Sequence, residues 1–131
     1  EKVISTIPLF SLKKIIKHKK LKYLEKFKGI GVILCIFKTK KKLSNSYWTT
    51  VSDELMPFNA IIQQNNLYSK NHIQIIYTSR YTSEDSQFYK MKTKDLSNLI
   101  FSNLEKIYKN FSQKDVIEFK IFKSNTYFTL F

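Results

Sequence analysis

Residues 29–37 read GIGVILCIF, nine consecutive residues without a charged side chain. Valine and isoleucine are enriched in strands, and a short apolar run next to glycine and lysine is typical of a buried strand. We therefore predict a buried strand over 32–39. The run is far shorter than the roughly 20 residues that cross a bilayer, so we expect no membrane span. It contains Cys35, the single cysteine of the chain, which we interpret as a small buried hydrophobe and not as a nucleophile.

Extended and helical patterns flank this strand on both sides. Further strands are predicted over 2–9 (stopped by Pro8), 47–51, 59–64, 73–81, 116–122 and 127–131, with polar connections over 65–71 and 82–92. Apolar spacing predicts short helices from Leu9 and from Leu21. A longer helix is expected after Thr93 as N-cap, with Asp95 in its first turn and an apolar stripe at 96, 99, 100, 104, 107, 108 and 111. This order predicts one α+β domain over residues 1–131, with a mixed, mainly antiparallel sheet and helices packed against it.

The chain carries a formal net charge of +13. Clustered cations bind nucleic acid by releasing its counterions. However, Arg80 is the one arginine in the sequence, and the planar guanidinium is the group best suited to phosphates and base edges. A compositional drift toward Lys, Asn and Ile also accounts for the charge. We therefore do not expect nucleic acid as the main partner, and keep a non-catalytic basic module for an anionic partner, such as nucleic acid, as the alternative function.

Few groups in the sequence are arranged for chemistry. The two glycines, Gly29 and Gly31, precede a strand, whereas the glycine-rich loop of a dinucleotide site follows a strand and opens a helix. His18, His72 and Cys35 fall in no spacing typical of metal ligands. We therefore expect no catalytic residue, no cofactor site and no metal site within this chain.

Aromatic residues gather in the predicted strands and at their ends. The simpler interpretation is that they form the sheet core and pair across strands. The alternative is a substrate pocket, which aromatic side chains line together with a few hydrogen-bonding groups. Candidates for such a pocket are Tyr47, Trp48, Tyr77 and Tyr81.

Four stretches, in order along nearly the whole chain, are similar to segments of one known group of proteins. Residues 31–38 (GVILCIFK), followed by Leu43 and YW at 47–48, are similar to one strand segment of that group. Residues 55–67 (LMPFNAIIQQNNL) are similar to its "PF-x-G-x-I-E-x-T-N" stretch. In that stretch Pro57, Phe58, Ile62 and Asn66 match, whereas Ala60 replaces glycine and Gln63 replaces an acidic residue. Residues 72–77 (HIQIIY) with RY at 80–81 resemble the strand that follows, and VISTIP at 3–8 resembles "VI-x-T-x-P". On these stretches the chain resembles FAD-dependent amine oxidase-like proteins, a group related to protoporphyrinogen oxidases, phytoene desaturases and UDP-galactopyranose mutases.

The resemblance implies a two-domain enzyme in which this region is the substrate domain. FAD in the full-length protein would be held by a glycine-rich loop and a C-terminal segment outside these residues, so we expect the chain alone to bind no FAD and to be inactive. Its partners would be a small-molecule substrate and the remaining flavin-binding part of the same protein. Relatives act on amines, polyprenyl hydrocarbons, porphyrins and nucleotide sugars. The resemblance adds Asn66 to the substrate-binding candidates Tyr47, Trp48, Tyr77 and Tyr81.

A cytoplasmic location is expected on separate grounds. The chain has one cysteine, which excludes an internal disulfide and suits a reducing compartment. Its first residues also lack the basic and apolar regions of a signal peptide.

Overall fold

The computed structural model describes residues 2–19, 22, 28–68 and 72–130, and its main feature is a five-stranded antiparallel sheet. The strands are β1 (Lys28–Thr39), β2 (Trp48–Thr50), β3 (Ala60–Gln63), β4 (Gln74–Thr82) and β5 (Val116–Leu130). Their order across the sheet is β2-β3-β4-β1-β5, and each pair of neighbours is antiparallel. The helical elements are α1 (Leu9–Ile15), α2 (Asn65–Tyr68), α3 (Gln87–Lys90), α4 (Thr93–Ile107) and the 3-10 turn η2 (Gln113–Asp115). The predicted α+β class with a mainly antiparallel sheet is confirmed.

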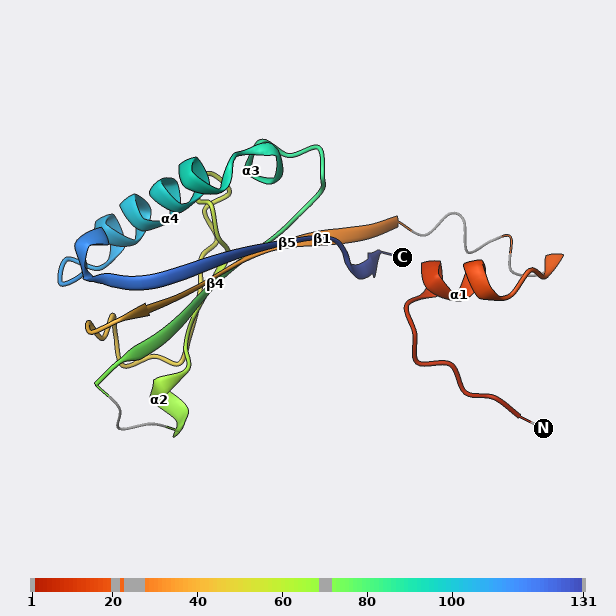
Figure 1. The fold of residues 1–131 in the computed structure, drawn as a ribbon, viewed down its shortest axis with the longest axis horizontal. Helices are drawn as coiled ribbons and strands as arrows, with labels where there is room; N and C mark the ends of the chain where they lie inside the picture. The colour runs from red at the N-terminus through yellow and green to blue at the C-terminus, as the bar shows by residue number, and fades with distance from the viewer. Residues whose placement is uncertain (1, 20–21, 23–27, 69–71, 131) are drawn as a thin grey trace.

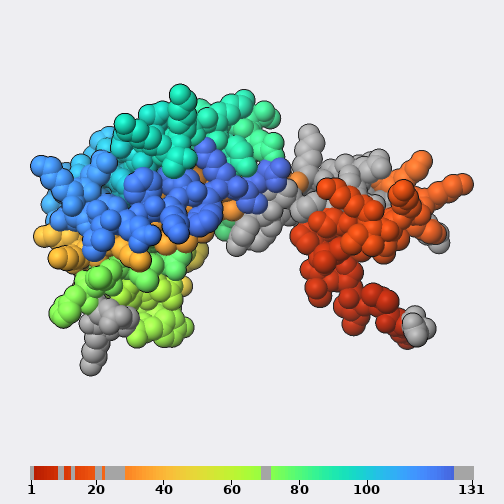
Figure 2. All heavy atoms as spheres, in the orientation of Figure 1, coloured from red at the N-terminus to blue at the C-terminus, as the bar shows by residue number. Residues whose placement is uncertain are grey.

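The sheet and α4 form two layers. Helices α3 and α4 lie over one face of the sheet (Figure 1), which we call the covered face. On the opposite face, called the open face below, large side chains remain half exposed: Trp48 by 51%, Tyr81 by 38% and Phe122 by 51%. Figure 2 shows that the N-terminal segment projects from the body formed by the sheet and α4. The sheet therefore presents one buried and one accessible surface.

The central strand β1 forms the middle of the core. Its side chains alternate between the two faces, because successive residues of a strand point in opposite directions. Ile33, Cys35, Phe37 and Thr39 are buried on the covered face, whereas the residues between them are half-buried or exposed. The predicted strand over 32–39 is thus confirmed, and it begins four residues earlier, at Lys28.

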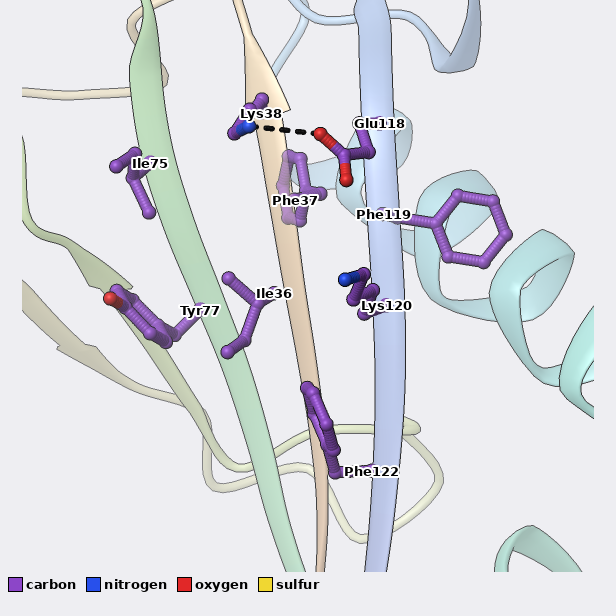
Figure 3. A pocket seen from close by; sticks show the side chains of 9 residues that line it. All are labelled: Ile36, Phe37, Lys38, Ile75, Tyr77, Glu118, Phe119, Lys120 and Phe122. Carbon is purple, nitrogen blue, oxygen red and sulfur yellow. Dashed lines mark hydrogen bonds and ion pairs between the residues drawn. The ribbon is translucent and has the colours of Figure 1, made fainter.

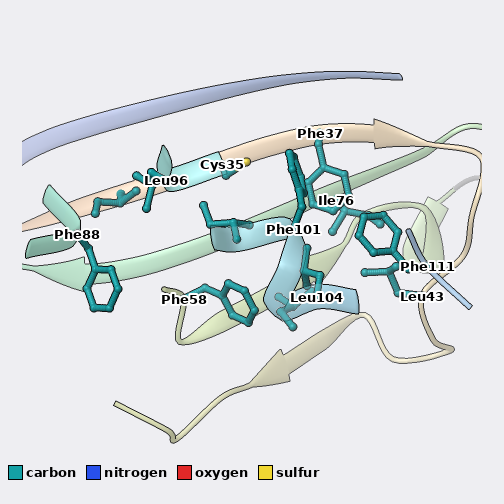
Figure 4. Packing of buried hydrophobic residues seen from close by; sticks show 13 residues of the cluster. Cys35, Phe37, Leu43, Phe58, Ile76, Phe88, Leu96, Phe101, Leu104 and Phe111 are labelled. Atoms are coloured by element: carbon teal, nitrogen blue, oxygen red, sulfur yellow. The ribbon is translucent and has the colours of Figure 1, made fainter. Parts of the chain in front are cut away.

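Helix α4 contributes the other half of the core. Phe101 contacts Phe37 of β1 edge to face, at 5.3 Å between ring centroids, and Phe119 of β5 at 5.5 Å. Phe111, just beyond the helix, lies 5.9 Å from Phe37. Figure 4 shows the rings of Phe37, Phe101 and Phe111 gathered between the helix and the sheet. The predicted stripe supplies most of this face but included Ile107, which is 39% exposed, and omitted Phe101, which is 1% exposed.

A bulge in β5 lies against Gly31. Between the pairs Ile30–Phe128 and Val32–Ser124, β1 advances by two residues while β5 advances by four. The extra backbone of β5 approaches Gly31 so closely that an added Cβ would lie 2.6 Å from the Ser124 carbonyl oxygen. Glycine permits this close approach because it has no side chain.

Two cations on the covered face hold loops in place. Arg80 donates hydrogen bonds to the carbonyl oxygens of Met56 and Glu54, and its guanidinium lies 4.5 Å from the centre of the Phe88 ring. Lys123 of β5 donates to the carbonyl oxygens of Tyr89 and Met91, each at 2.6 Å. Lys123 therefore ties β5 to the C-terminal end of α3.

Several predicted boundaries were wrong. Residues 2–6 form no strand, because a strand needs a neighbour for its backbone groups and none of the described strands pairs with them. Helix α4 begins at Thr93 itself, with Lys92 as N-cap and no side-chain cap, so packing of its buried face fixes its start. The predicted segments 116–122 and 127–131 belong to one strand, which runs through the bulge and ends at Leu130; residue 131 lies outside the described residues.

The polar connections contain two short helices that the sequence patterns did not indicate. Helix α2 forms within 65–71, and α3 forms within 82–92, where the Ser86 side chain accepts a hydrogen bond from Tyr89 N. Helix α1 agrees with the prediction from Leu9. The second predicted helix, from Leu21 to Phe27, lies outside the described residues apart from residue 22.

Candidate functional site

The open face carries a row of side chains that crosses the whole sheet. Pairing between neighbouring strands aligns one residue from each strand: Trp48, Ile62, Tyr77, Ile36 and Lys120, in order from β2 to β5. Neighbouring strands are about 4.8 Å apart, so the row extends about 19 Å. It has an aromatic end, an apolar middle and a cationic end. We take this face as the candidate functional site because no described helix covers it.

A groove of about 300 Å³ lies on the open face over β4, β1 and β5. Tyr77, Ile36 and Lys120 cross its middle side by side, as the strand pairing requires (Figure 3). The Phe122 ring leans from β5 over β1 at one end of the groove (Figure 3). Small-molecule sites commonly enclose about 300–1,000 Å³. The groove therefore suits a small organic molecule, or one portion of a larger one.

Three charged side chains border the groove. Lys38 Nζ lies 2.9 Å from Glu118 Oε2, across the β1–β5 pairing. The hydrogen bond from Lys38 lowers the pKa of Glu118, assisted by the charge of Lys38 and, least, by that of Lys120. Lys120 itself makes no hydrogen bond or ion pair with the residues that the structure describes. Because Glu118 compensates Lys38, the groove retains the positive charge of Lys120.

The structure places three of the five predicted substrate-binding residues on one face. Tyr77 lines the groove, and Trp48 lies in the same row two strands away. Tyr81, opposite Val32, lies further along β4 on the open face. Tyr47 precedes β2; its side chain is half-buried and its carbonyl oxygen accepts a hydrogen bond from Gln63 N at 2.8 Å. The role of these residues in substrate binding stays a prediction.

Asn66, the fifth candidate, holds a loop. Its side-chain nitrogen donates to the carbonyl oxygens of Ser44 and Ser46, at 3.1 and 2.9 Å. Gln63, which is 1% exposed, supports the same loop. Its Oε1 accepts from the backbone nitrogens of Leu43 and Ser44, while its Nε2 donates to Ser44 Oγ and the Ser46 carbonyl oxygen. The polar positions of the 55–67 stretch thus fix the segment that leads into β2 and Trp48.

The sequence reasoning missed the residues of the groove on β1 and β5. Ile36, Lys38, Glu118, Lys120 and Phe122 border the groove but were not among the candidates. Alternation along 32–39 and along 116–122 could have assigned each of them to a face. It could not have indicated that β5 pairs with β1, because a strand's own pattern does not identify its neighbour. The residues of the groove could therefore be predicted only if the pairing and register of the strands were known.

Cys35 is buried on the covered face, and burial raises its pKa to about 12. The folded chain therefore keeps the thiol protonated to a higher pH than the unfolded chain does. The contribution of this thiol to the free energy of unfolding is fully present below its ordinary pKa of 9.0 and is lost as the pH rises toward 12.

The reactivity of Cys35 tests its burial. We expect an aromatic disulfide reagent to label Cys35 far more slowly at pH 8 in the native chain than in urea, because labelling requires an accessible thiolate. Equal rates in both conditions would contradict the buried position.

Two other kinds of site are not found in the part of the chain that the structure describes. No group of three or more histidine, cysteine, aspartate or glutamate side chains could hold a metal ion. No described helix is both long and apolar enough to span a membrane.

Comparisons with known proteins connect the fold to a larger protein. No family model and no curated protein matches this sequence. The fold does match the crystal structure of a protein described as "Putative protoporphyrinogen oxidase" from Exiguobacterium sp. 255-15, with a TM-score of 0.71 and 12% sequence identity. The match covers 92% of this chain and 28% of that protein, so this chain spans well under a third of its length. The chain therefore has the fold of one part of a protoporphyrinogen oxidase-like protein, as the resemblance of its sequence implies.

Proposed function

We propose that this chain is the substrate-binding portion of an FAD-dependent, amine oxidase-like oxidoreductase, with the open face as one wall of the substrate pocket. The observation that carries the proposal is the match in fold to part of a protein described as a protoporphyrinogen oxidase. The open face supports it, because ligand pockets are lined mainly by apolar and aromatic side chains. Trp48, Tyr77 and Phe122 provide such a surface.

The described residues do not fit a flavin phosphate site. Both glycines lie inside β1, and backbone oxygens of Ser124 and Thr82 fill the space beside Gly31. A phosphate-binding loop needs glycines before a helix, where backbone N–H groups are open to the ligand. In this proposal another part of the protein holds the flavin, and the flavin supplies the redox chemistry when bound.

The contribution of this chain is to bind and orient the substrate. Ile36, Tyr77 and Phe122 offer apolar surface that would exclude water from one side of a bound molecule. Two groups with shifted pKa values are poorly placed to exchange protons with it: Cys35 is buried on the other face, and Glu118 is held by Lys38. Without the flavin-binding part we therefore expect no oxidase activity.

Mapping of amide chemical shifts tests the open face as a substrate wall. The ¹⁵N-labelled chain is titrated with one soluble compound from each class that relatives handle: an amine, a short polyprenyl compound, a porphyrin and a nucleotide sugar. We expect at least one of them to shift amides of β4, β1 and β5, and we expect FAD to shift none. Shifts confined to α4, or no binding by any compound, would count against this role. Stoichiometric binding of FAD to this chain would contradict the proposal that another part of the protein holds the flavin.

A basic binding module for an anionic partner is the second candidate. Single-stranded nucleic acid binds to sheets that combine exposed aromatic rings with positive charge, and this chain has both on the open face. Arg80, however, donates to the 54–56 loop on the covered face and is not on that surface. In the same titration, binding of a single-stranded oligonucleotide that weakens steeply with salt would favour this candidate. No binding at low salt would remove it.

A further inference from the structure

We propose that the groove on the open face selects a negatively charged ligand with a flat apolar body about 10 Å long, whose anionic group contacts Lys120. The inference rests on the proposed function, since it assigns a charge and a direction to a molecule lying on the same face. It favours an organic anion over an amine or an uncharged hydrocarbon. The argument depends on three features of the groove: its apolar floor, its length and its uneven charge.

The floor of the groove is apolar and continuous across three strands. Ile36 occupies its centre, with Tyr77 beside it on β4 and the Phe122 ring leaning over β1 (Figure 3). A flat ring system would bury its face against these side chains, and the burial of apolar area is the main favourable term in such contacts. From Tyr77 to Lys120 there are two interstrand spacings, or about 10 Å. That is the length of two fused rings with one short substituent.

The charges at the groove are not equivalent. Lys38 is held at 2.9 Å by Glu118, and the carboxylate of Glu118 would repel an anion placed beside that pair. Lys120 makes no hydrogen bond or ion pair with the described residues, although its charge also acts on Glu118. Its nitrogen lies on the side toward Ile36 (Figure 3). A carboxylate at the Lys120 end of the row would gain an ion pair without displacing an existing one. The ligand would therefore lie with its rings over Ile36 and Tyr77 and its charge over β5.

The general basicity of the chain does not produce this arrangement. Lys94, for example, is an exposed lysine of α4 and is not one of the residues that line the groove. A nonspecific attraction by the net charge of +13 would act equally at both lysines and would be screened by salt. Lys94 is thus a matched control for the loss of one positive charge.

The test uses three compounds of the same shape: 2-naphthoate as the anion, 2-naphthamide as the neutral analogue and 2-(aminomethyl)naphthalene as the cation. Each is titrated into the ¹⁵N-labelled chain at 150 mM salt, and affinity is read from amide shifts in β4, β1 and β5. We expect the anion to bind most tightly, the neutral amide less tightly and the cation least tightly. Replacing Lys120 with methionine, which keeps an apolar stem, is expected to weaken naphthoate binding about fivefold and to leave naphthamide unchanged. Lys94→Met should leave both unchanged.

A second variant, Glu118→Gln, keeps the proposal testable if Lys120→Met fails to fold. Glu118→Gln removes the partner of Lys38, so a second cation becomes available and naphthoate should bind more tightly than to the unchanged chain. Equal affinity for the anion and the amide, or an equal effect of the Lys120 and Lys94 substitutions, would overturn the inference while leaving the open face as a binding surface. Failure of all three compounds to shift these strands would count against the proposed function itself.

Discussion

Replacing Gly31 with alanine is expected to lower the free energy of unfolding by about 3 kcal/mol, the upper part of the range for added atoms in a packed core. The new Cβ would lie 2.6 Å from the Ser124 carbonyl oxygen and 2.9 Å from that of Thr82. Both are backbone atoms, one on each neighbouring strand, so no side chain can rotate away to make room. The change would have to move β4 or β5 away from the central strand.

Urea denaturation of the purified chain measures this loss, and Gly29→Ala is its matched control. Gly29 lies on the same strand two residues earlier and is exposed. There alanine should be neutral or stabilising, by about 0.5–1 kcal/mol, because glycine in a strand costs backbone entropy. Similar midpoints for the two variants would contradict the close approach of the β5 bulge. Tyr77 lies on β4 and Lys120 on β5, so a displacement of either strand by Gly31→Ala should also weaken ligand binding at the groove.

Replacing Gln63 with alanine is the second substitution for which we expect a large effect, also about 3 kcal/mol of unfolding free energy. Its side chain makes four hydrogen bonds to the 43–46 segment. A donor or acceptor left unpaired in a buried position costs about 1–3 kcal/mol, and the Leu43 nitrogen would lose its buried partner. The neighbouring Gln64 provides the control, since the described contacts show a hydrogen bond from its backbone but none from its side chain.

The substitution Gln63→Glu tests the role of the side-chain amide at a position where the family that the sequence resembles has an acidic residue. Glutamate could still accept from the nitrogens of Leu43 and Ser44, but it could not donate to Ser44 Oγ or to the Ser46 carbonyl oxygen as the amide does. We therefore expect Gln63→Glu to be destabilised as well, with faster hydrogen exchange at the amides of 43–46. Stability equal to that of the unchanged chain would mean that the amide donors contribute nothing.

Local sequence patterns were sufficient to predict the elements that bury one of their own faces in the core. The apolar run of β1 and the stripe of α4 are examples, because burial of one face imposes a period on the sequence. The strand predicted over 2–9 failed because extended backbone also needs a partner, which no pattern within the segment reveals. Phe101 was omitted because it lies at the edge of the stripe, where contact with Phe119 of a distant strand buries it.

The candidate site was predictable only in part for a related reason. Trp48, Tyr77 and Tyr81 could be proposed as aromatic residues in strands, and the register brings them to one face. Lys120 and Phe122 could not, because they enter the site through the pairing of β5 with β1. Asn66 was proposed from the resemblance alone, and its amide is directed at the backbone of Ser44 and Ser46. Such a contact depends on the path of a loop that composition does not determine.

The strand order also dictates when the sheet can form. Cys35 of the central strand pairs with Thr78 on one side and Ile121 on the other, 43 and 86 positions later in the chain. Contacts so distant in sequence slow folding, because a long loop must close before any pairing energy is gained. During synthesis the apolar strand β1 is therefore made before either of the strands with which it pairs. Its exposure over that interval makes nascent chains of this protein candidates for chaperone binding.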